Sequence, residues 1–302
     1  MKLTREMLGA LKIKLEGDLI IPNKILLDGK EVDVTELAST QIVDTYKDNG
    51  ETMYLSDILG LFAFNDDIIS VVIPDSVTKI GDRTFDHCKN LKKVTFPEGL
   101  MSIGYEAFGC CKNLSEAIIP KNVSTIEDFA FLYCESLTSI IIPDSVTKIG
   151  NGAFQGCEEL TSVILSDNIT EISDMLFAEC INLEEITIPN SVKVIGYQSF
   201  DECMNLTHIT IPDSVVEIYS NAFQNCANLR TVDWNSPIKL TKEMINDIFF
   251  NCPSLETINY HGKSIKIRYG SIDDVINTAC ISNKDKSLTR PTEIIKYDNK
   301  DR

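Results

Sequence analysis

The sequence predicts a solenoid, in which short repeated units stack on one another and share a single core. The nine-residue segment IPDSVTKIG occurs at residues 73–81 and again at 142–150, and its first five residues return at 211–215. Both intervals are 69 residues, which is three periods of 23 residues. A period between about 20 and 50 residues is typical of solenoids and repeat arrays.

Four residue types recur at steps of 23 residues and share one phase. The prolines, with Ser166 as their one replacement, are Pro74, Pro97, Pro120, Pro143, Pro189 and Pro212. The phenylalanines are Phe85, Phe108, Phe131, Phe154, Phe177, Phe200 and Phe223. The cysteines are Cys88, Cys111, Cys134, Cys157, Cys180, Cys203 and Cys226, and a leucine follows each of them by three residues. One unit cannot bury these side chains alone, but stacked units can, because equivalent residues then line a continuous core.

Each unit contains a short predicted strand and a predicted turn. In residues 137–142 the apolar side chains alternate, which favours a strand, and the strand ends at Pro143 because proline has no N–H to donate. Ala153, Phe154 and Cys157 fall within one turn of chain. This spacing predicts a single helical or 3₁₀ turn on the opposite side of the coil.

The repeated run L-x-x-I-x-I-P resembles the strand half of a leucine-rich repeat, and the 23-residue length with its A-F-x-x-C block resembles the BspA-type subgroup. The resemblance covers roughly residues 51–260. It implies a leucine-rich-repeat solenoid with short parallel strands on the concave side, short helical or 3₁₀ turns on the convex side, and atypical caps at both ends. Proteins similar by motif are mostly bacterial or protist surface proteins, so the resemblance also implies adhesion to a host extracellular or cell-surface protein.

The repeat divides the chain into three predicted parts. Residues 51–260 form the solenoid, with about nine units, of which seven are strict (74–234) and the first, residues 53–73, is degraded. Residues 1–50 form a β-rich cap that covers the first strand edge. Residues 261–302 form a C-terminal cap and tail.

Local patterns predict the elements of the two ends. In the N-terminal part we expect strands at 12–15, 19–21, 25–27 and 32–34, a hairpin turn at Asp28-Gly29, and a helix from Thr35 to Tyr46. Near the other end we expect a short helix capped by Thr241, a strand at 265–268, a helical turn at 271–277 and a loose tail from Ile281.

Composition limits the classes of partner. The net charge of −17 disfavours nucleic acid and anionic membrane surfaces as partners. No apolar run of about 18 residues exists, so no membrane span is expected. The segment after Met1 shows no hydrophobic signal region. A cell-surface or secreted location, which the resemblance implies, and a cytoplasmic one therefore both stay open.

The ten cysteines and three histidines form no recognisable metal or catalytic motif. We expect the repeated cysteines to be reduced, buried core residues, which indicates a reducing cytosol or an anaerobic exterior. His87 adjoins Cys88, but neighbouring side chains should point to opposite sides, one outward and one inward. No cofactor, metal site or enzymatic activity is predicted.

The predicted binding site is a column of residues on the concave face. In leucine-rich repeats the residue between two inward-facing strand positions points outward, which selects Val72, Thr95, Ile118, Ile141, Ile164, Thr187 and Thr210, continued by Asp233 and Asn259. The column two residues earlier adds Glu185 and His208 as a polar rim. Ile118, Ile141 and Ile164 form an exposed aliphatic stripe, which indicates either an interaction site or merely good strand formers.

The sequence therefore predicts a non-catalytic protein-binding module that uses this face to bind a macromolecular partner. The alternative is an intracellular scaffold or a module that associates with itself.

Overall fold

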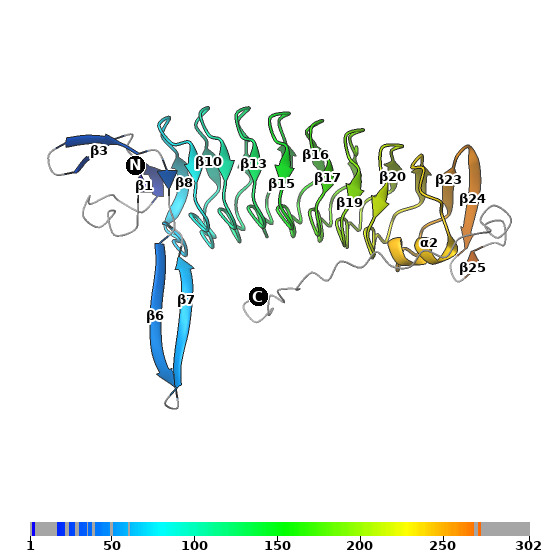
Figure 1. Ribbon diagram of the computed structural model, residues 1–302, viewed down its shortest axis with the longest axis horizontal. Helices are drawn as coiled ribbons and strands as arrows, with labels where there is room; N and C mark the ends of the chain where they lie inside the picture. Colours follow the sequence, from blue (N-terminus) through cyan, green and yellow to red (C-terminus); the bar gives the residue numbers. More distant parts are fainter. Residues whose placement is uncertain are drawn as a thin grey trace.

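The protein is a stack of coils, and the stack extends along one long axis (Figure 1). A computed structural model describes residues 2–3, 17–21, 24–27, 30–34, 36–37, 40–48, 51–59, 61–268 and 271–272. Within these residues most coils contribute one short strand to each of two parallel ladders, and the last two coils contribute only to the first ladder. The predicted solenoid is confirmed.

The first ladder contains the strands that the sequence predicts before each proline. Its strands are β2 (Gly17–Ile20), β8 (Ile68–Val72), β10 (Lys93–Thr95), β12 (Glu116–Ala117), β14 (Ser139–Ile141), β16 (Ser162–Ile164), β18 (Glu185–Ile186), β20 (His208–Ile211), β22 (Thr231–Trp234) and β23 (Thr257–Tyr260). Paired neighbours lie parallel and, between strict units, in register at steps of one repeat, so that Ile141 lies opposite Ile164.

The second ladder was not predicted. Its strands are β1 (Lys2–Leu3), β5 (Glu36–Leu37), β9 (Lys79–Ile80), β11 (Ser102–Ile103), β13 (Thr125–Ile126), β15 (Lys148–Ile149), β17 (Glu171–Ile172), β19 (Val194–Ile195) and β21 (Glu217–Ile218). A turn joins the two strands of a coil, and in it the N–H of Val146 donates to the carbonyl of Pro143 (2.9 Å). Ser166 replaces proline without leaving a buried polar group unpaired, because its hydroxyl donates to the carbonyl of Val146 (2.7 Å).

The segment after the second strand is an irregular run of tight turns, in which the N–H of Gln155 donates to the carbonyl of Gly152 (3.0 Å). The predicted turn is therefore present, but it does not form a helix. Gly152 and Gly156 have positive φ angles of 57° and 70°, and residues at the equivalent positions of other coils share this left-handed backbone. The N–H groups of Gly152, Phe154 and Gly156 donate to carbonyls of the next coil. A helix would need those N–H groups for bonds within its own segment, so hydrogen bonding between coils excludes it.

A row of stacked phenylalanine rings fills the core. Phe154 lies 5.5 Å from Phe131 and 5.9 Å from Phe177 between ring centroids, and the planes are nearly parallel. The stacked row is Phe62, Phe85, Phe108, Phe131, Phe154, Phe177, Phe200, Phe223 and Phe249. Every ring in it is buried, which confirms the phase assigned from the sequence.

The repeated cysteines lie beside the phenylalanine row. The thiol of Cys157 donates to the carbonyl of Phe131 in the preceding coil (3.4 Å), and the same bond recurs from Cys88 to Cys252. A small residue with a weak donor therefore suits this position, since it fills the core and pairs a buried carbonyl. None of the nine cysteines in the described part of the chain forms a disulfide. Cys280 lies outside the described residues.

The N-terminal part contains an interrupted coil. Ile20 of β2 lies opposite Val72 of β8, and Leu37 of β5 lies opposite Ile80 of β9. Two antiparallel hairpins interrupt this coil, namely β3 (Lys24–Leu27) with β4 (Lys30–Asp33), and β6 (Thr40–Asp48) with β7 (Glu51–Leu59). Figure 1 shows β6 and β7 extending away from the stack. Three strands that precede residue 51, namely β1, β2 and β5, thus pair into the ladders of the solenoid.

Several N-terminal predictions are confirmed and two are wrong. The strands predicted at 19–21, 25–27 and 32–34 correspond to β2, β3 and β4, and the β3–β4 register fits a two-residue connection. The helix predicted from Thr35 to Tyr46 is wrong, because β5 and β6 occupy this segment and pair with β9 and β7. The predicted start of the degraded unit at residue 53 is also wrong, since residues 53–59 belong to β7. The strand predicted at 12–15 lies outside the described residues.

At the other end, α2 (Lys242–Ile248) is the predicted short helix, and the Thr241 hydroxyl accepts the N–H of Met244 as its N-cap (3.2 Å). β24 (Lys263–Arg268) confirms the predicted strand and pairs antiparallel with β23. β25 (Ser271–Ile272) contradicts the start of the predicted helical turn. The rest of that turn and the tail lie outside the described residues.

No helix within the described ranges has the length and apolar character to cross a membrane. The boundaries at residues 50 and 260 stay predictions.

Candidate binding face

The outward column of the first ladder defines a surface that we call the strand face. It consists of Ile20, Val72, Thr95, Ile118, Ile141, Ile164, Thr187, Thr210, Asp233 and Asn259. The pleat of the strands produces it: Ile140 is 2% exposed in the core, whereas its neighbour Ile141 is 61% exposed. The structure therefore brings the residues predicted from the sequence into one line.

The N-terminal half of the strand face is aliphatic. Ile118, Ile141 and Ile164 are 82%, 61% and 57% exposed, as predicted. The aliphatic surface also extends past Thr95 to Val72 and Ile20, both of which are exposed. Sequence reasoning missed Ile20 because the interrupted first coil was not recognised. Contiguous apolar side chains in water are typical of interaction sites, since covering them is favourable.

The C-terminal half of the strand face is polar and hydrogen-bonded within the chain. The His208 ring hydrogen-bonds with the hydroxyls of Thr231 (2.8 Å) and Thr210 (3.3 Å). The amide of Asn259 donates to the carboxylate of Asp233 (2.7 Å). These groups are held in place by one another, so they form an ordered rim beside the aliphatic half. Glu185 and Thr187 lie between the two halves and are exposed.

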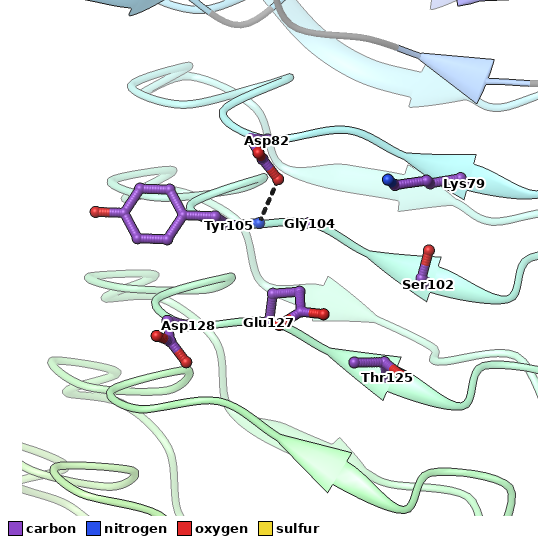
Figure 2. A pocket seen from close by; sticks show the side chains of 8 residues that line it. All are labelled: Lys79, Asp82, Ser102, Gly104, Tyr105, Thr125, Glu127 and Asp128. Carbon is purple, nitrogen blue, oxygen red and sulfur yellow. Dashed lines mark hydrogen bonds between the residues drawn. The ribbon is translucent and has the colours of Figure 1, made fainter.

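A separate pocket of about 380 Å³ lies along the second ladder (Figure 2). Its lining includes Lys79, Ser102 and Thr125 from β9, β11 and β13, and the carboxylates Asp82 and Asp128 from the turns that follow. Asp82 accepts the backbone N–H of Tyr105 (3.0 Å), and Asp128 accepts that of Asn151 (2.8 Å). Because these carboxylates join successive coils, the pocket is explained by the fold, and the strand face is the better candidate.

The architecture defines a class of protein: a parallel-strand solenoid of stacked repeats, which presents an extended surface. Residues 59–184 and 147–279 match the family described as BspA type leucine rich repeat region (6 copies). The chain belongs to this family, whose fold in general serves interaction and not catalysis. No curated protein matches the chain.

Two solved structures have a similar fold. A leucine-rich repeat protein from Bacteroides ovatus ATCC 8483 is 23% identical, with a TM-score of 0.53 over 80% of this chain and 68% of its own. A leucine-rich repeat protein from T. pallidum is 29% identical, with a TM-score of 0.52 over 64% of this chain and 79% of its own.

Proposed function

We propose that the protein is a non-catalytic interaction module that binds a macromolecular partner through the strand face. The single observation that supports this is the line of exposed aliphatic side chains at Ile118, Ile141 and Ile164. An apolar patch bordered by ordered polar groups is typical of a protein–protein interface. The stack of short coils is rigid, so binding orders little of the receptor itself.

The partner that fits this face is a protein. The net charge of −17 opposes binding to phosphate backbones. The aliphatic half of the strand face favours a partner with apolar side chains of its own. We propose a host extracellular or other cell-surface protein as the partner and an adhesin-like role at the bacterial surface, which the resemblance to BspA-type proteins supports.

The second candidate is an intracellular scaffold or a module that associates with itself. The same aliphatic line favours it, because a second copy of the chain would offer an identical apolar surface. Pull-down from extracellular matrix proteins and from cell lysate in parallel distinguishes the two, with light scattering to detect self-association. Capture from matrix alone supports adhesion, and a dimer in solution supports self-association.

Replacing Ile118, Ile141 and Ile164 together by threonine is expected to weaken partner binding by about 100-fold, at about 1 kcal/mol for each side chain. The fold should be unaffected, because threonine is also β-branched and the three side chains are exposed. Titration calorimetry against the captured partner, after circular dichroism has confirmed folding, measures the change.

A control replaces exposed apolar side chains by threonine on the side of the second ladder. Met101 and Val216 are 57% and 60% exposed and occupy equivalent positions ahead of β11 and β21. The variant with Met101→Thr and Val216→Thr should bind as the wild type does. If the triple variant keeps wild-type affinity, the strand face is not the site.

A further inference from the structure

Cys110 differs from the other cysteines of the described chain. The remaining eight thiols are buried and donate to backbone carbonyls in the core. Cys110 is only partly buried and lies on the irregular turn, outside that row. It follows His87 by 23 residues, so it occupies the same position in the next coil.

His87 lies between Cys110 and a buried carboxylate. Its Nδ1 is 2.8 Å from Oδ1 of Asp86, a residue that is only 5% exposed. The Phe64 ring stacks on the imidazole at 4.6 Å, which fixes the plane of the ring. A ring nitrogen of His87, the Cys110 sulfur and an Asp86 oxygen all lie within 4.8 Å of one another.

The neighbouring coil leaves room for this arrangement. A Cβ atom on Gly109 would lie 2.8 Å from Oδ1 of Asp86, so a larger residue there would displace the carboxylate that orients His87. Arg83 and Glu106 form an ion pair on the same two turns. They are the other charged groups near Asp86, and their charges oppose one another.

The surroundings favour the protonated imidazole. The hydrogen bond with Asp86, and then that with Cys110, raise the pKa of His87 to about 10. Burial raises the pKa of the Asp86 carboxyl, and His87 opposes that shift. A positively charged imidazole beside a thiol favours the thiolate, which is the nucleophilic form of cysteine.

We propose that Cys110, His87 and Asp86 form a reactive-thiol site that undergoes exchange with small organic disulfides. The order of the groups is that of an activated cysteine: a thiol, an imidazole beside it, and a carboxylate that orients the imidazole. The inference is independent of the strand face, which lies on another side of the coil. It assigns a covalent modification site to a chain whose interaction surface is elsewhere.

The exchange step balances without a further reagent. Cys110 reacts as the thiolate that the protonated imidazole of His87 stabilises, and this thiolate attacks one sulfur of the disulfide. A new S–S bond forms to Cys110 while the original S–S bond breaks. The second half of the disulfide leaves with the bonding electron pair and takes the proton from His87. Cys110 is oxidised to a mixed disulfide, and the departing half is reduced to a thiol.

The geometry favours this chemistry over metal binding. Asp86 is hydrogen-bonded to Nδ1 of His87, so the carboxylate and that nitrogen cannot both bind a metal ion without separating. A metal ion held by the other ring nitrogen and the thiol alone would lack the three or four protein ligands that zinc sites use. Zinc binding is therefore included as an opposing outcome of the test.

The test follows the release of coloured thione when native full-length protein reacts with dithiodipyridine, a neutral aromatic disulfide. The protein and all its variants carry Cys280→Ser, so that only the cysteines of the described residues can react. One equivalent should react fast, and the modified peptide should contain Cys110. The rate at about pH 6 should be within about threefold of that at about pH 8. In His87→Gln the rate should rise about 75-fold over that interval, as for a thiol of ordinary pKa near 8.5.

Two controls separate reactivity from disturbed folding. His261→Gln makes the same change at an exposed histidine that belongs to neither the strand face nor the proposed thiol site, and it should leave the rate profile unchanged. Cys110→Ser should abolish the fast phase without altering the melting temperature. The proposal is overturned if His87→Gln keeps the wild-type pH profile, or if the fast peptide contains another cysteine. It is also overturned if one equivalent of Zn²⁺ binds tightly in a manner that requires all three residues.

Discussion

Replacing Phe154 with alanine is expected to lower the free energy of unfolding by about 3–5 kcal/mol. Phe154 is fully buried in the middle of the ring row, with Phe131 on one side and Phe177 on the other. The cavity cannot close by local collapse, because the adjacent coils are held at fixed spacing by ladder hydrogen bonds. Reversible urea unfolding, followed by circular dichroism, measures the loss.

Phe250→Ala is the matched control for this variant. Phe250 immediately follows the last ring of the row, Phe249, but its own side chain is 57% exposed. Its removal should cost less than about 1 kcal/mol. A loss below about 1 kcal/mol for Phe154→Ala would contradict the position assigned to that ring.

Gly150→Ala is the second substitution for which a large effect is expected, a loss of at least about 2 kcal/mol from overpacking. A Cβ atom at Gly150 would lie 2.3 Å from both the backbone nitrogen and Oδ1 of Asp128 in the preceding coil. Backbone atoms cannot move away as the end of a flexible side chain can. The two coils would have to separate, which would weaken the hydrogen bond from the Asn151 N–H to Asp128.

Gly99→Ala tests whether the effect comes from the close approach of the coils and not from the loss of glycine. A Cβ atom at Gly99 would meet only the carbonyl oxygen of Asp75, at 3.6 Å, which is ordinary contact. This variant should be neutral or slightly more stable, because alanine restricts the unfolded chain. Equal melting temperatures for the two variants would show that the coils do not approach closely at Gly150.

The core rows and the strand face could be predicted because strict repetition fixes their phase. Once Phe154 and Ile141 are placed in one coil, every equivalent residue is placed by counting. The second ladder was not predicted, because each of its strands in the described residues has only two residues, such as Lys148 and Ile149 in β15. Two residues are too few to show alternation. The turn was mistaken for a helical one because spacing alone does not reveal hydrogen bonds to the next coil.

The interrupted first coil was missed because insertions hide the period, although the sequence contains its traces. Ile21-Pro22 repeats the start of a unit, and Val34-x-x-Leu37 repeats the spacing of Val77 and Ile80. Val34 follows Ile21 by 13 residues, whereas Val77 follows Ile73 by four. The Asn49-Gly50 pair between two alternating segments was also a strong hairpin signal.

The contact between His87 and Cys110 was missed for a different reason. His87 stands next to Cys88 in the sequence, and those two side chains do diverge, since Cys88 is fully buried and His87 is partly exposed. In a stacked repeat the relevant neighbour is one period away. Pairs of reactive residues at steps of 23 should therefore be compared across coils before adjacent residues are.

The rigidity of the ring row is what connects the fold to the proposed function. The residues of the strand face stay aligned only if successive coils keep the same register. The shared row of phenylalanine rings fixes that register. Substitutions that separate coils, such as Gly150→Ala, should therefore weaken partner binding at Ile141 and Ile164 as well as stability.

A double-mutant cycle on the ring row tests the stacked core most directly. Phe131 and Phe154 stack at 5.5 Å, so their alanine substitutions should be non-additive by at least about 1 kcal/mol in urea unfolding. Phe85 and Phe200 lie five repeats apart, and their substitutions should add to within about 0.5 kcal/mol. Additive losses for the adjacent pair would show that the rings do not share a row, and would contradict the solenoid and the strand face together.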